Sequence, residues 1–190
     1  MVDAPVRQTE KVVSAVELMY SIRSKASLPM NILSEQQARA RQLSLPLDGL
    51  LTGVSREFVA ELQLNGTFVE YNQQMIVNEG RPADYVFCVI DGRVNISRRN
   101  DNFGKVYLAA LGPGQWYGER EVFLRTSSEE EAFAEGEVIL WTIPTDTLRD
   151  LFFASPAAVQ LLYNFGVLLA QKLSMKAQAP SLVSTAAVAE

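Results

Sequence analysis

The chain has 190 residues, 48% hydrophobic and 21% charged, which is enough for one substantial core with flanking segments but short for two full domains. It contains no histidine and one cysteine, Cys88, which excludes His-based catalytic triads, His-ligated metal sites, cysteine metal clusters and an intrachain disulfide. The formal net charge of -5 disfavours direct DNA binding. No apolar run reaches the length of a membrane-spanning helix and the polar start Met1–Glu10 is unlike a signal peptide, so we expect a cytoplasmic protein.

The first part of the chain shows helical periodicity. Apolar residues recur every three to four positions over residues 9–25, which predicts an amphipathic helix. A looser, partly helical connector follows, and Ser55 is expected to cap a helix that ends near Asn65–Gly66. We therefore expect an N-terminal helical extension and connector over residues 1–50, ahead of the main domain over residues 51–176.

Beyond Gly66 the period changes from about 3.6 residues to 2, which predicts strands. The expected strands lie at 67–71, 75–78, 85–90, 93–97, 105–110 and 137–143. Asp91-Gly92 is a typical type I′ hairpin turn and predicts that the strands on either side of it pair. A second turn over residues 100–104 leads into an alternating, half-buried strand at 105–110. The sequence therefore predicts a mainly β domain, either a sandwich or a small barrel.

Helical periodicity returns after the last expected strand. Thr145 is expected to cap a short helix, and Ser155-Pro156 is expected to begin a final helix that reaches about Lys176. One apolar stripe of that helix contains Val159, Leu162, Gly166, Leu169 and Leu173. A second apolar set lies off this stripe. One contact with the barrel would not cover both sets, so we expect the second set to contact a dimer mate or a partner helix. It contains Leu161, Phe165 and Leu168. Residues 177–190 lack periodicity and are expected to form a disordered tail.

Three segments carry a family resemblance: MIVNEGRPADYVFCVIDGRVNI, LAALGPGQWYGE and VILWTI. In their order and in the placing of their glycines, they resemble the cyclic-nucleotide-binding domain of catabolite activator proteins and cAMP-dependent kinase regulatory subunits. The resemblance implies an antiparallel jelly-roll β-barrel with helices before it and a two-helix hinge after it. The last hinge helix is often a dimer contact in that family.

The family's phosphate-binding cassette begins with an aromatic or apolar residue followed by Gly-Glu, matched here by Tyr117-Gly118-Glu119. The resemblance implies that the glycine lets the backbone approach the ligand and that the glutamate accepts the ribose 2′-hydroxyl. The family also places an arginine about ten residues beyond the glycine, but this chain has Ser127-Ser128-Glu129-Glu130-Glu131 there. Losing that arginine forfeits charge-assisted hydrogen bonds worth about 1.5–3 kcal/mol. We therefore expect a degenerate nucleotide site, with Arg125 as the nearest substitute cation and Arg120 as a weaker one.

Two functions follow from this pattern. The first is a non-enzymatic regulatory or adaptor module that acts through protein contacts, including a possible homodimer through the last helix, with no cofactor and no metal. The alternative is a true sensor of a cyclic nucleotide or another small ligand that moves the last helix. Its ligand site would contain Gly118, Glu119, Arg120, Arg125, Ser127 and Ser128. A cupin-like enzyme is disfavoured because histidine ligands are missing, and a transcription factor because few residues follow the hinge helix.

Other conspicuous residues have simpler interpretations. The acidic run Glu129–Glu131 is expected to be a solvated surface rather than a cation site. Cys88 lies in an apolar run and is expected to be a buried small hydrophobe rather than a redox group. Trp116 and Trp141 lie on expected strands, which favours core packing over stacking on a base.

Overall fold

The structure, a computed structural model, describes residues 30–82, 84–100 and 104–178, with side chains up to residue 174. The expected helix at 9–25 and residues 179–190 of the expected tail lie outside the described residues. In chain order the elements are β1 Asn31–Ile32, α2 Glu35–Ala40, η1 Gly49–Leu51, α3 Arg56–Asn65, β2 Thr67–Asn72, β3 Met75–Val77, β4 Tyr85–Asn100, β5 Gly104–Leu111, β6 Trp116–Tyr117, α4 Glu119–Leu124, β7 Glu131–Pro144, α5 Thr145–Ala154, η2 Pro156–Ala158 and α6 Val159–Gln178.

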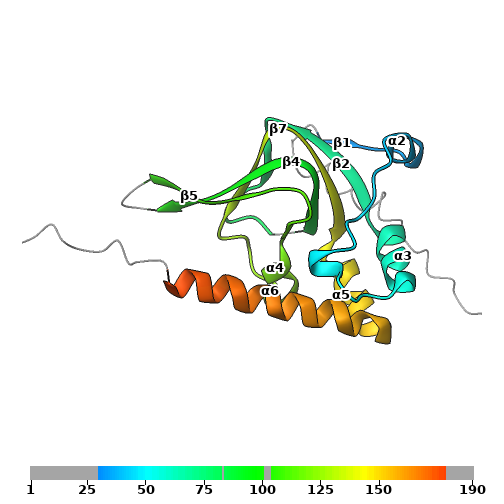
Figure 1. Cartoon of the computed structure of the whole chain (residues 1–190). Helices are drawn as coiled ribbons and strands as arrows, with labels where there is room; N and C mark the ends of the chain where they lie inside the picture. Colours follow the sequence, from blue (N-terminus) through cyan, green and yellow to red (C-terminus); the bar gives the residue numbers. More distant parts are fainter. Residues whose placement is uncertain (1–29, 83, 101–103, 179–190) are drawn as a thin grey trace, which may run out of the picture.

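The strands form one antiparallel sheet of seven strands that curls into a roll (Figure 1). The main path runs β1-β2-β7-β4-β5, while β3 pairs with β7 and β6 pairs with β4. The long strands β4 and β7 form the centre, where they pair from Tyr85↔Pro144 to Ser97↔Glu131. The helices α4, α5 and α6 gather beneath the roll, with α6 along its underside (Figure 1). The predicted fold, a mainly β roll with flanking helices, is confirmed.

Alternation along the central strands creates two hydrophobic cores. Phe87 and Val89 of β4 point into the roll, whereas Val86 and Cys88 point toward the helices. Trp141 is fully buried in the helix-side core and lies edge-on to Trp116, with ring centroids 5.7 Å apart. The predictions that both tryptophans and Cys88 are buried are therefore confirmed.

Two of the expected helix starts can be compared directly with the structure. The Ser55 side chain accepts a hydrogen bond from the Phe58 amide at 3.2 Å, so the prediction that Ser55 caps α3 is confirmed. Gly66 follows this helix, and a Cβ there would lie 2.1 Å from the Trp141 ring. The prediction that Thr145 caps the next helix is wrong. The N-cap of α5 is Pro144, because β7 runs directly into the helix.

The expected hairpin turn at Asp91-Gly92 is wrong. β4 continues through both residues, and its pairing with β7 shifts register on either side of Asp91. Gly92 has φ 85°, which suits a bulge as well as a type I′ turn. β4 and β5 pair antiparallel as far as Asn100↔Gly104, while residues 101–103 of the turn expected between them lie outside the described residues.

Gly92 should be intolerant of any side chain. A Cβ there would lie 2.4 Å from the carbonyl oxygen of Glu137, and its φ is unfavourable for an L-residue. We expect Gly92→Ala to lower the free energy of unfolding by about 2–4 kcal/mol, measured by urea denaturation. Gly136 is the control because it has φ 74° and a Cβ added there would meet nothing within 4 Å. Equal losses in Gly92→Ala and Gly136→Ala would contradict a role for the close contact.

β5 is more exposed than its alternating sequence predicts. It is an edge strand that projects from the roll together with the end of β4 (Figure 1). Tyr107 is 60% and Leu108 38% exposed. The prediction of a half-buried strand is therefore wrong over most of β5, because within the described residues no second layer covers this part of the hairpin.

The face of α6 that packs on the roll is the opposite of the expected one. Leu161 and Phe165 are completely buried and Leu168 packs against the same core, so the expectation that they form a free dimer surface is wrong. Phe165 is held by ring contacts, with centroids 5.7 Å from Phe152 and 6.3 Å from Trp116. The set expected to pack on the barrel is largely exposed instead. It includes Val159 at 66%, Leu162 at 40% and Leu173 at 68% exposure.

α5 and α6 meet at a sharp bend. η2 joins the two helices, and Pro156 is its first residue, where the missing N–H costs no helical hydrogen bond. Within the described residues, no single helix is long and apolar enough to span a membrane. Thr145–Ala154 and Pro156–Ser174 meet the length and composition of a span only when they are taken together, and the angle between them is 111°.

Candidate functional site: the cassette around α4

The start of the cassette is fixed against β4. β6 pairs with β4 through Phe87↔Tyr117, and Gly118 then turns the chain into α4 with φ 94°. A Cβ at Gly118 would lie 3.0 Å from the Tyr85 carbonyl oxygen and 3.2 Å from the Val86 Cα. The tight approach and the positive φ together require glycine here.

Glu119, the expected ligand-binding carboxylate, lies in the interior. It is 4% exposed, and its Oε1 accepts a hydrogen bond from the Lys172 ammonium of α6. Its Oε2 is buried without a hydrogen-bond partner among the described residues. A second acid, Glu121, is also buried, and this burial raises the pKa of its carboxyl. The cassette therefore holds two carboxyl groups within a low-dielectric environment.

Arg120 pairs with carboxylates of the chain itself. Its Nη1 donates to Glu129 at 2.8 Å and its Nη2 to Glu121 at 3.2 Å. Glu129 lies in the stretch where the resemblance implies the phosphate-binding arginine. The cation that α4 offers is thus already bound by two acidic side chains.

Ser127 and Ser128 close the cassette against the loop after β3. The Gly80 amide donates to the Ser128 carbonyl at 2.8 Å, and the Ser128 amide donates to the Arg81 carbonyl at 2.9 Å. Ser127 forms an isolated bridge with Pro82. The Ser128 hydroxyl is buried, 3.0 Å from the Tyr117 hydroxyl, and donates to the Glu130 carbonyl at 2.9 Å. Both serines therefore have structural contacts.

Arg125 lies apart from this cluster. It ends α4 in a left-handed conformation with φ 54°, and its backbone amide donates to the Glu121 carbonyl at 3.1 Å. Its side chain is exposed and forms no ion pair within the described part of the chain. The structure therefore joins Glu119 to Lys172 and Arg120 to Glu121 and Glu129, whereas Arg125 forms only the helix end.

Sequence reasoning missed Lys172, although a signal for it exists. Leu161, Phe165, Leu168 and Lys172 are spaced by four, three and four residues, which places them on one helix face. Lys172 was missed because the face that contains Leu161, Phe165 and Leu168 was assigned to a partner contact rather than to the roll. A correct assignment of the buried face would have pointed Lys172 toward the roll.

The acidic run divides into two environments. Glu129 is exposed, but Glu131 at the start of β7 is buried and pairs with Lys105 at 2.8 Å and Arg99 at 3.6 Å. The expectation of a uniformly solvated run is therefore wrong at Glu131. Across residues 30–82, 84–100 and 104–178, no three acidic or thiol groups gather as a metal site.

Cys88 has the chemistry of a core residue. It is fully buried, and burial raises the pKa of its thiol to about 12. The reactive thiolate is therefore scarce at neutral pH.

Comparison with known proteins identifies the domain. The family model described as "Cyclic nucleotide-binding domain" matches residues 71–155, which run from the end of β2 to just beyond α5. This part of the chain is a cyclic nucleotide-binding domain. The cyclic nucleotide-binding domain of Methylobacillus flagellatus has the same fold, with a TM-score of 0.69 and 19% identity over 83% of this chain and 92% of that one.

Two curated relatives resemble the chain over part of their length. The CRP-like protein Clp of Xanthomonas campestris is 30% identical over 101 residues, which cover 52% of this chain and 44% of Clp. Glutaminase 2 of Bradyrhizobium diazoefficiens is 30% identical over 118 residues, or 62% of this chain and 18% of that protein. The chain thus spans less than half the length of either relative. Its domain is of the type found in CRP-like regulators.

Proposed function

We propose that the chain is a non-enzymatic regulatory module that does not bind cyclic nucleotides in its family's usual way. The ion pair between Glu129 and Arg120 carries the proposal. An incoming cyclic phosphate would meet the Glu129 carboxylate where the family offers a cation. The one arginine within α4 is already neutralised by Glu129 and Glu121. Like charges repel and the available cation is occupied, so phosphate binding is disfavoured.

Titration calorimetry of the full chain with cAMP and cGMP tests this proposal. We expect neither nucleotide to bind with micromolar affinity, because loss of one charge-assisted contact weakens affinity by about tenfold to a hundredfold. A circular dichroism spectrum of the same sample verifies that the protein is folded. Micromolar binding that disappears in Glu119→Gln would refute the proposal and support a sensor.

The sensor remains the alternative function, and one observation favours it. Glu119 Oε2 is buried and has no partner among the described residues, so it can still accept a hydrogen bond from a ligand hydroxyl. The calorimetric titration distinguishes the two functions.

We further propose that the module assembles as a homodimer through the outer face of α6. Exposed residues on this face recur at spacings of three and four, the pattern by which helices interdigitate. The stripe contains Val159, Leu162, Tyr163, Gly166, Val167, Ala170 and Leu173. A stripe on one helix can pair with its own copy across a two-fold axis, which argues for a second copy of this chain as the occupant.

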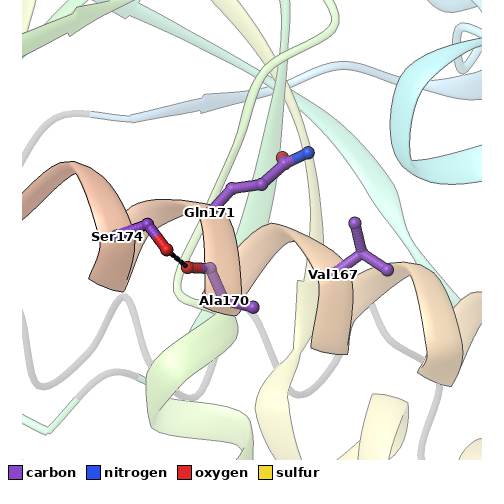
Figure 2. Close-up of a pocket in the computed structure, with 4 residues that line it drawn as sticks. All are labelled: Val167, Ala170, Gln171 and Ser174. Atoms are coloured by element: carbon purple, nitrogen blue, oxygen red, sulfur yellow. Dashed lines mark hydrogen bonds between the residues drawn. The ribbon is translucent and has the colours of Figure 1, made fainter.

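The small residues of this stripe suit a close helix contact. Val167 and Ala170 of this stripe line a pocket on α6 together with Gln171 and Ser174, and the Ser174 hydroxyl donates to the Ala170 carbonyl at 3.0 Å (Figure 2). The Ser174 side chain therefore satisfies its donor within its own helix. Gly166 has open space around it, so a facing helix can approach the backbone there.

The proposal places the module in the cytoplasm, with no cofactor and no direct DNA contact by the described domain.

A further inference from the structure

We propose that Lys172 is a latch that replaces a ligand: by binding Glu119, it holds the last turns of α6 against the cassette in the ligand-free protein. Lys172 and Glu119 are 53 residues apart in sequence and belong to different elements, α6 and α4. The carboxylate that would bind a ligand is therefore used for an internal contact. The latch does not depend on the proposed loss of nucleotide binding.

The environment of Glu119 makes this contact necessary. The Glu119 side chain is 5% exposed, and its only described hydrogen bond comes from Lys172. A buried carboxylate without a counter-charge is strongly unfavourable. The buried carboxylate therefore depends on Lys172 as its partner, and this dependence favours the arrangement in which α6 lies against α4.

The environment of Lys172 shows what the contact does for the helix. Phe165 and Leu168 pack α6 against the core, but Ala170, Gln171, Leu173 and Ser174 are exposed. Beyond Leu168, apolar burial therefore contributes little to the docking of α6. Lys172 supplies a charged contact at the point where hydrophobic packing ends.

The latch has room to open. A groove of about 520 Å³ lies beside α6, and its lining includes Lys172, Gln171 and Trp116 together with Gly49 and Gly114. The Lys172 side chain is 34% exposed, so it can move from Glu119 into this groove without entering the core. A ligand whose hydroxyl group donates to Glu119 Oε1 would compete with Lys172 for that oxygen. Such a ligand would weaken the contact between α4 and the end of α6.

Amide hydrogen exchange on the full chain, without ligand and at one fixed protein concentration, tests the latch. We expect Lys172→Met to increase the exchange rates of residues 169–174 at least about tenfold, because ion-pair loss permits local opening of the helix end. Glu119→Gln should have a similar effect. The double variant should exchange no faster than the faster single variant, because both changes break the same contact.

Two further variants control for other causes. Gln171→Met makes a similar change on the adjacent, exposed residue and should leave exchange unaltered. Lys172→Arg keeps the charge and should retain most of the protection. Unchanged exchange in Lys172→Met, or equal acceleration in Gln171→Met, would overturn the proposal. Glu119→Gln provides a second route if Lys172→Met fails to fold, because the amide removes the buried charge. Nucleotide binding by the wild-type chain would refute the proposed function and leave this result unaffected.

Discussion

Replacement of Glu129 by arginine should increase the affinity of the chain for cAMP about 10- to 100-fold, since a charge-assisted hydrogen bond contributes about 1.5–3 kcal/mol and each 1.4 kcal/mol is a factor of ten. The change removes a carboxylate that pairs with Arg120 at 2.8 Å and adds a guanidinium in the stretch where the family has one. Arg120 also loses one of its two acidic partners. Titration calorimetry of Glu129→Arg beside the wild-type chain measures the gain.

The control must separate a local effect from a change in net charge. Glu57 is exposed in the first turn of α3, outside the cassette, so Glu57→Arg changes the net charge by the same amount. We expect no gain in cAMP affinity from that variant. A folded Glu129→Arg protein that still fails to bind would contradict the view that Glu129 is the main obstacle. The Lys172–Glu119 contact would then be the next obstacle to remove.

The features that sequence could predict are those that depend on local chemistry. The Ser55 cap requires only a hydroxyl near its own helix start, and its bond to Phe58 joins neighbouring residues. The alternation in β4 and β7 depends only on the period of a strand, so the buried tryptophan of β7 could be anticipated. The Gly118-Glu119 pair was recognisable only through its resemblance to the family's cassette, and the close approach of Gly118 to β4 gives the physical reason for glycine at that position.

Features that depend on tertiary partners could not be predicted in the same way. Gly92 has a positive φ that serves a hairpin turn or a bulge equally well, and only the pairing of β4 with β7 selects the bulge. α6 has two apolar stripes, and its packed stripe is selected by aromatic rings from three other elements that surround Phe165. The Lys172–Glu119 pair joins residues far apart in the chain, and that long-range contact follows from the choice of stripe.

The second large effect concerns assembly. Leu162→Glu should shift the proposed dimer toward the monomer, with the dissociation constant rising about 10- to 100-fold. Only the 40% of Leu162 that one chain leaves exposed can be buried by the dimer, which contributes about 1 kcal/mol per protomer, and the substitution occurs twice in a symmetric dimer. Leu162 is 40% exposed within one chain, so its replacement should change the melting temperature of the isolated protomer little. Light scattering coupled to size-exclusion chromatography gives the mass at each concentration.

Two leucines provide matched controls for Leu162→Glu. Leu64 on α3 is 84% exposed and lies off the α6 stripe, so Leu64→Glu should leave the dimer intact. Leu161 is fully buried in the helix-side core, so Leu161→Glu should unfold the protein rather than dissociate it. Substitution of Leu162 would then affect assembly, whereas substitution of the adjacent Leu161 would affect stability. The difference arises because Leu161 packs against the roll of its own chain and Leu162 lies on the face proposed to contact the second copy. A monomeric wild-type chain at high micromolar concentration, or a Leu162→Glu protein that dimerises as tightly as the wild-type chain, would contradict assembly through this face.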